Sequence, residues 1–240
     1  MFSYLLSIMT LNYQEQSNEL VRRSEQVIAA QGATISAFCS LVEARDNETG
    51  NHIRRTQHYV LELCERLRTH PRFSAELTAE NIQLIFKSAP LHDIGKVAIP
   101  DCILHKPGRL TADEWVVMKR HAEFGANAIA AAQGSVGDGN TSFLEYAREI
   151  ALTHHELWNG SGYPRNLAGD AIPLAGRLMA VADVYDALIS RRVYKEPFSH
   201  EAALELMRAE NGKHFDPDVL DCMLAVAWRF EDIARSLADD

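Results

Sequence analysis

The chain has 240 residues, of which 47% are hydrophobic, and its formal net charge at pH 7 is −9. This length and composition predict one main domain with a sizeable core and room for a short appendage. The negative charge argues against a protein that coats nucleic acid, because such a protein needs a basic face.

The first segment, residues 1–11, is apolar but has no basic flank and is much shorter than the roughly 20 residues of a membrane span. We therefore expect neither a signal peptide nor a transmembrane helix. The four cysteines are far apart and form no CxxC pair, which argues against a disulfide framework or a thiolate zinc site. They are typical of reduced thiols in a cytoplasmic protein.

A seven-residue repeat of apolar residues follows and predicts a helix with a coiled-coil-like seam. Two interpretations stay open: a dimer stalk, or an amphipathic helix that packs on its own domain. The repeat consists of Val21, Ile28, Ile35 and Val42, with Leu20, Val27, Phe38 and Leu41 beside them.

Helical spacing of apolar residues recurs along the rest of the chain, and strand-like alternation is nowhere sustained. The fold class is therefore predicted to be all-α. Thr111 with Glu114 predicts a capping box, and Asp216 followed by Pro217 predicts a helix start. We expect loops at 133–142 and 158–173, and helices at 53–67, 79–89, 112–132, 143–155, 174–190, 201–209 and 217–237.

Ionisable residues interrupt these apolar helical segments. Glu48 and His52 lie four residues apart and would share one helix face. The apolar run at 89–96 contains His92, Asp93 and Lys96, and burying such charges requires compensation. A core ion pair between Asp93 and Lys96 is one explanation, and a metal site is the other.

Later segments continue the pattern. His121 follows the capped helix, and the adjacent pair His154 and His155 ends a helix just before the long loop. Asp183 and Asp186 lie three residues apart on an otherwise apolar helix, so at least one needs a positive partner. Imidazoles with carboxylates and no thiolate suit iron, manganese, zinc or nickel. Ions that share one aspartate could activate a water for attack on a phosphoryl group.

These pieces together resemble the HD-GYP subgroup of the HD-domain metal-dependent phosphohydrolases, over about residues 38–224. The resemblance implies an HD-domain helical bundle at 38–240 and an N-terminal helical linker or stalk at 1–37. Its motifs are the runs 43–52, 92–96, 154–156, 158–164 and 183–188, then Arg192 with Lys195, and finally 214–217. Run 158–164 ends in Gly162, Tyr163 and Pro164, the GYP of the subgroup's name.

The resemblance also implies the activity, which is hydrolysis of the bacterial second messenger cyclic di-GMP to the linear dinucleotide pGpG and, in some members, to GMP. It implies two or three divalent metal ions, with Asp93 shared between two of them and Glu48 supporting a third. The implied metal ligands are Glu48, His52, His92, Asp93, His121, His154, His155 and Asp183.

Asp93 and Lys96 are the implied catalytic residues, and Lys96 would contact the substrate or its developing charge. Arg192 and Lys195 would hold the second phosphate. Gly162, Tyr163 and Pro164 would shape the loop beside the guanine and a surface for diguanylate cyclase (GGDEF) partners.

Two other functions compete with this one. A catalytically silent module could bind a cyclic dinucleotide or a protein, but such a module is typically marked by lost ligands, and every expected ligand is present. A related HD hydrolase could act on another nucleotide, such as a cyclic GMP-AMP hybrid. Arg192, Lys195 and the GYP loop favour a cyclic ligand with two phosphates.

Overall fold

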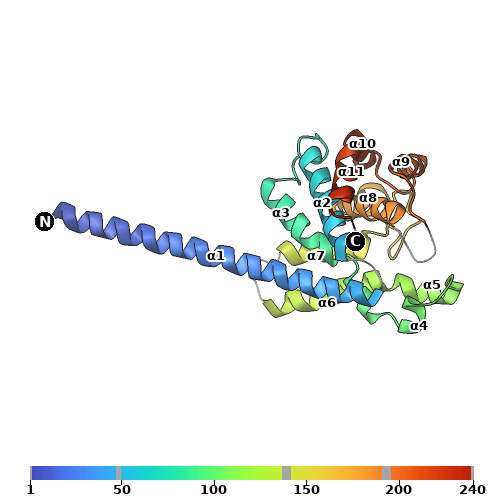
Figure 1. The fold of residues 1–240 in the computed structure, drawn as a ribbon, viewed down its shortest axis with the longest axis horizontal. Coiled ribbons are helices and arrows are strands. Elements are labelled where there is room, and N and C mark those ends of the chain that lie inside the picture. The colour runs from blue at the N-terminus through green and yellow to red at the C-terminus, as the bar shows by residue number, and fades with distance from the viewer. Residues whose placement is uncertain (1, 47–49, 137–141, 191–195, 239–240) are drawn as a thin grey trace. The chain divides into compact units, whose positions relative to one another are not determined.

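The computed structural model describes residues 2–46, 50–136, 142–190 and 196–238, and the helices in these ranges confirm the all-α prediction (Figure 1). The chain divides into two units, residues 1–38 and residues 39–240. None of the described helices carries an apolar stretch long enough to cross a lipid bilayer. The N-terminal repeat lies on one helix, α1 (Phe2–Asp46).

The second unit contains α-helices and short 3₁₀ turns, and the described residues include no extended strand. Two pairs of residues form isolated β-bridges. The helices are α2 (Gly50–Leu67), α3 (Ala79–Ser88), α4 (Asp101–Leu104), α5 (Ala112–Lys119), α6 (His121–Val136), α7 (Ser142–Thr153), α8 (Leu174–Ile189), α9 (His200–Ala209), α10 (Pro217–Ala225) and α11 (Ala227–Ser236). The 3₁₀ turns are η1 (Ala89–Leu91), η2 (Ile94–Ala98) and η3 (Gly169–Ala171).

Helices α2 and α8 form the centre of the core. Tyr59 of α2 stacks on Phe230 of α11 with ring centroids 4.6 Å apart, and it meets Tyr185 of α8 edge to face. Ten of the sixteen residues of α8 are buried, which explains its nearly continuous apolar sequence. The two carboxylates of α8 therefore lie at the edge of this core or within it.

Local sequence signals explain several helix starts. Thr111 and Glu114 form the predicted capping box, and the carboxylate of Asp216 accepts a hydrogen bond from the Asp218 amide at the start of α10. Both predictions are confirmed.

Other boundaries were predicted wrongly. The helix expected at 112–132 is two helices that break at Arg120, whose N–H bonds back to the Val117 carbonyl. The helix expected at 217–237 also breaks in two, at Val226, whose N–H bonds to the Met223 carbonyl. The loop expected at 133–142 is wrong at both ends, because α6 runs to Val136 and α7 begins at Ser142, and residues 137–141 lie outside the described residues. The break at Arg120 makes His121 the first residue of α6.

A close backbone contact sets the position of η2 against α6. A Cβ atom added at Gly95 would lie 1.9 Å from the His121 carbonyl oxygen and 2.4 Å from the Gly125 nitrogen. Only glycine allows this approach, which places the run 92–96 directly beside His121.

We predict that Gly95→Ala lowers the free energy of unfolding by roughly 1–3 kcal/mol or more, because a backbone clash must be relieved by shifting η2 or α6. Urea denaturation measures the change. Gly134→Ala is the matched control, since no atom lies within 4 Å of its added Cβ and alanine favours the helix by up to about 1 kcal/mol. Equal stability of the two variants would contradict the role of Gly95.

Candidate metal centre

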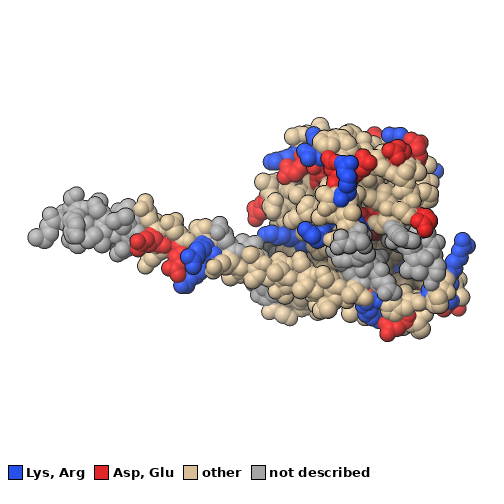
Figure 2. All heavy atoms as spheres, in the orientation of Figure 1, with Lys and Arg blue, Asp and Glu red and all other residues tan. Residues whose placement is uncertain are grey.

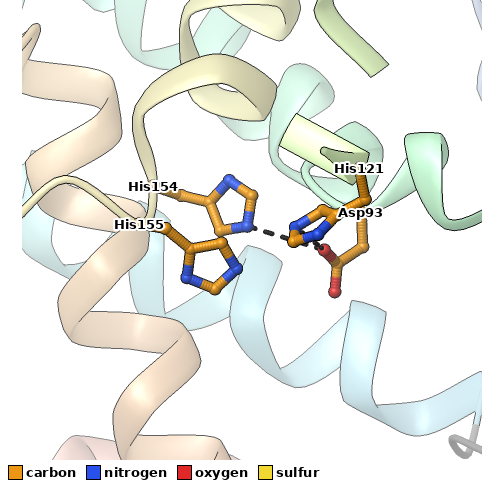
Figure 3. A group of neighbouring side chains, drawn as sticks. All are labelled: Asp93, His121, His154 and His155. Carbon is orange, nitrogen blue, oxygen red and sulfur yellow. Dashed lines mark ion pairs between the residues drawn. The ribbon is translucent and has the colours of Figure 1, made fainter. Parts of the chain in front are cut away.

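Seven of the predicted ligands converge in two groups whose ligand atoms lie within 4.8 Å of one another inside each group. The first group is drawn in Figure 3, where side chains from the start of α6, from the residues just after α7 and from the start of η2 point toward one another. It consists of Asp93, His121, His154 and His155, and the second group consists of His52, His92 and Asp183.

The imidazole rings of His92, His121 and His154 are each oriented by a hydrogen bond between Nδ1 and a backbone carbonyl oxygen. The Nδ1 atom lies 2.8 Å from the Met118 carbonyl in His121 and 2.9 Å from the Ile150 carbonyl in His154. In His92 it lies 3.1 Å from the Ala89 carbonyl. Since a carbonyl only accepts, each Nδ1 carries the proton and each Nε2 carries a lone pair.

These Nε2 atoms fit a metal site. In His92, His121 and His154 the Nε2 atom is buried and makes no hydrogen bond to any described residue. A buried acceptor without a donor is costly, and a cation in each group would satisfy these nitrogens, His121 and His154 in the first group and His92 in the second. The set of nitrogen and oxygen donors therefore fits a divalent metal.

Asp93 lies between the two groups. Its Oδ1 is 3.2 Å from the Nε2 of His121 and 3.5 Å from that of His154, and its Oδ2 is 3.3 Å from the Nε2 of His92. Burial alone would raise the pKa of the Asp93 carboxyl, but Lys96 and His92 hold it well below its usual range. Asp93 is therefore an ionised carboxylate with one oxygen facing each group.

The adjacent histidines of the first group, His154 and His155, are suited to bind a cation as neutral ligands, because the pKa of each is lowered. Burial lowers the pKa of His154, although Asp93 partly opposes this effect. Burial, with His154 and His121 nearby, lowers the pKa of His155 well below its usual value. His92 differs, because burial lowers its pKa but the carboxylate of Asp93 raises it by more.

A buried ion pair between Arg55 and Asp186 supports His52 of the second group. The sequence analysis did not identify Arg55 as the partner. His52 Nδ1 lies 2.9 Å from Asp186 Oδ2, and its Nε2 lies 3.8 Å from Asp183. Arg55 donates to both oxygens of Asp186, at 2.7 and 2.9 Å. Burial would raise the pKa of Asp186, but His52 and Arg55 lower it to about 2. Arg55 is thus the positive partner expected for one aspartate of α8.

The end of α1 contributes two further residues that the sequence analysis left without a role. Asp46 accepts a hydrogen bond from Lys96 Nζ at 2.5 Å, and Asp93 lies 2.8 Å from the same nitrogen. Arg45 donates to the backbone carbonyls of Lys96, Val97 and Ile99. Asp93 and Lys96 therefore form the ion pair, and Asp93 also belongs to a candidate ligand group. The ion-pair and metal-site interpretations of this segment are thus compatible.

The GYP loop closes one side of the first group. Glu156 is buried and accepts from the amides of Arg165 and Leu167, at 2.7 and 3.0 Å. The Tyr163–Pro164 peptide bond is cis. A Cβ atom added at Gly162 would lie 2.2 Å from the Leu157 nitrogen, so the loop lies against the end of α7 where the histidine pair is.

Three predicted site residues, Glu48, Arg192 and Lys195, lie outside the described residues. Arg45, Asp46, Arg55 and Glu156 were not predicted as site residues. Their charge, within or beside the site motifs, was the signal that could have found them. Their partners are distant in sequence, so the sequence did not show what each one binds.

The chain matches a known family model described as the HD domain over residues 37–219. A cyclic di-GMP phosphodiesterase of Vibrio cholerae is 52% identical over 222 residues, which are 92% of this chain and 45% of the relative. A 3'3'-cGAMP-specific phosphodiesterase 2 of the same organism is 45% identical over 84% of this chain and 36% of the relative. This chain spans about half the length of these curated relatives, or less.

A solved structure supports the fold. The crystal structure of a cyclic GMP-AMP specific phosphodiesterase of V. cholerae aligns with a TM-score of 0.51 at 20% identity. The alignment covers 85% of this chain and 53% of that chain.

We predict that Asp186→Asn lowers the affinity for Mn²⁺ by about 10- to 100-fold, because Asp186 orients His52 from outside the group of ligands. Calorimetric titration of chelator-stripped protein measures the affinity, and the exposed Asp232→Asn serves as control. Thermal unfolding should also shift down, since Arg55 loses a buried charged partner. Unchanged Mn²⁺ affinity would reduce Asp186 to a purely structural role.

Proposed function

The chain belongs to the HD domain family, and we propose that it is a metal-dependent phosphodiesterase that hydrolyses cyclic di-GMP. The observation that carries this proposal is the pair of ligand groups that meet at Asp93. The name of the relative at 52% identity supports the substrate. The predicted HD-GYP subgroup is consistent with both comparisons.

We propose that the centre holds two divalent ions, iron or manganese, with zinc or nickel as alternatives, because imidazoles with carboxylates suit these metals. Glu48 would support a third ion. When bound, such ions activate water for attack and neutralise charge on the phosphoryl group.

The residues of the chain then have separate tasks in the reaction. Asp93 holds the two groups at a common point, and the histidines exclude water from the buried side of the centre. Lys96 Nζ, held between Asp46 and Asp93, is placed to contact the charge that develops on phosphorus. The oxygen of water bonds to phosphorus, the P–O3' bond breaks, and O3' takes a proton. The product is pGpG, and a second hydrolysis yields GMP.

Substrate binding is proposed to involve the GYP loop and two cations. Arg192 and Lys195 would hold the phosphate that is not cleaved, since a guanidinium can contact phosphate oxygens in two places. Gly162, Tyr163 and Pro164 would border the guanine and present a surface to GGDEF proteins. Figure 2 shows acidic and basic side chains interspersed on the visible face of the molecule.

A 3'3'-cGAMP substrate is the second candidate, because a relative at 45% identity is named specific for it. Both candidates are cyclic dinucleotides with two phosphates and at least one guanine. A cytoplasmic location would suit either substrate, and Cys64, Cys102 and Cys222 are free thiols, as expected in a reducing compartment.

The N-terminal segment 1–37 is proposed to be a helical stalk that pairs with a second copy. Leu20, Val21, Val27 and Phe38 are exposed large apolar side chains on the repeat. The side chain of Ile28 lies outside the described residues.

We expect a homodimer at micromolar concentration that Val21→Glu converts to monomer, because a charge would enter the apolar seam. Light scattering measures the mass. Ala29→Glu, which is exposed on the same helix but outside the repeat, should leave the dimer intact. A wild-type monomer would exclude the stalk interpretation.

Metal-loaded wild-type protein is expected to convert cyclic di-GMP to pGpG, with slower turnover of 3'3'-cGAMP, as measured by chromatography of the products. Asp93→Ala should reduce turnover by more than about 100-fold, since even residues outside the ligand groups affect such sites by 10- to 100-fold. Elemental analysis should show reduced metal in the same variant.

Retained metal and retained turnover in Asp93→Ala would refute the shared-ligand assignment. Faster turnover of 3'3'-cGAMP than of cyclic di-GMP would favour the second candidate.

A further inference from the structure

Tyr163 of the GYP loop lies directly on the first ligand group. Its ring stacks on the imidazole of His155, with centroids 4.8 Å apart and an interplanar angle of 27°. His121 approaches the same ring edge to face at 6.4 Å. Burial, followed by the carboxylates of Asp93 and Asp183, raises the pKa of the phenol, so the hydroxyl stays protonated. Tyr163 therefore forms a neutral wall of the metal centre.

Two residues of α5 extend this wall outward. The ring of Trp115 meets that of Tyr163 at 6.5 Å and 77°, and Lys119 Nζ lies 5.6 Å from the centroid of the Tyr163 ring. Trp115 and Lys119 are four residues apart and share one face of the helix. The wall thus runs from His155 through Tyr163 to Trp115 and Lys119 on α5.

The indole of Trp115 is available for binding because 47% of its surface is exposed. Exposure of one aromatic side chain is common, but an exposed indole beside the candidate metal centre offers a flat apolar face on which a base can stack. The capping box of Thr111 and Glu114 holds the start of α5, and Lys106 pairs with Glu114 at 2.5 Å. The position of Trp115 is therefore set before any ligand arrives.

We propose that Trp115 is the stacking surface for one purine base of the cyclic dinucleotide, and that Lys119 contacts the acceptor edge of that base. Guanine presents O6 and N7 as acceptors, which suit an ammonium, whereas adenine presents a donor at N6. Aromatic stacking supplies affinity for any base, and the lysine supplies a preference for guanine. The inference rests on the proposed function, since it assumes a cyclic dinucleotide at the metal centre.

The binding test uses tryptophan fluorescence with a phosphorothioate analogue of cyclic di-GMP that resists hydrolysis. The analogue should quench the metal-loaded wild-type protein, and Trp115→Phe should remove most of that quenching. Trp228→Phe is the matched control, because this indole is also about half exposed but lies on α11 beneath Arg229. Quenching that persists in Trp115→Phe would overturn the proposal.

The kinetic test separates binding from chemistry. Trp115→Ala should raise KM for cyclic di-GMP by about 10-fold or more, with a much smaller loss in kcat. Trp115→Phe should recover part of the loss, and metal content should equal that of the wild type. An unchanged KM in Trp115→Ala would assign this surface to another occupant, such as a protein partner, and would reject base stacking.

The lysine is tested by base preference. Lys119→Met should weaken binding of cyclic di-GMP more than binding of cyclic di-AMP, whose adenines lack O6. An unchanged ratio of the two affinities would remove Lys119 from the proposal. If wild-type protein fails to hydrolyse cyclic di-GMP, the proposed function fails, and the quenching experiment still decides whether Trp115 contacts a nucleotide.

Discussion

The buried carboxylate of Asp93 is the constraint on which the rest of the structure depends. An ionised group in a protein interior is costly unless charge and hydrogen bonds compensate it. Here Lys96 and three imidazole nitrogens lie within 3.5 Å of its oxygens. Lys96 and His92 are neighbours of Asp93 in sequence, but His121 and His154 come from distant segments, so compensating Asp93 requires α6 and the end of α7 to meet the segment 92–96. The same meeting of segments brings together the side chains that could bind metal ions.

Close packing of backbone maintains this convergence. Gly95 lets η2 touch α6, Gly162 lets the GYP loop touch the end of α7, and Gly176 lets α8 approach Thr153. At each contact a side chain as small as alanine would overlap its neighbour. The ligand groups are therefore assembled from rigid elements in direct contact, and a change of less than an ångström in their packing would alter ligand distances.

Chemistry and specificity are separated in space in this arrangement. Arg55 and Asp186, which support the second ligand group, are buried, and the ligand groups themselves are buried or partly buried. The proposed substrate contacts lie on the GYP loop and on the exposed face of α5. Relatives named for cyclic di-GMP and for 3'3'-cGAMP match the same chain. A conserved type of metal centre with variable residues around it would account for both names.

The sequence by itself determined the all-α class, the helix starts at Thr111 and Asp216, and a set of ligand residues whose chemistry suited metals. These follow from local signals: periodicity, capping groups, and ionisable residues in apolar runs. The roles of these residues as metal ligands remain predictions, as do the roles of Glu48, Arg192 and Lys195. The tertiary structure alone decided that Arg55 compensates Asp186, that Arg45 binds the carbonyls of η2, and that helices break at Arg120 and Val226. The contacts of Arg55 and Arg45 depend on partners distant in the chain, and local sequence does not encode which partner a buried charge will meet.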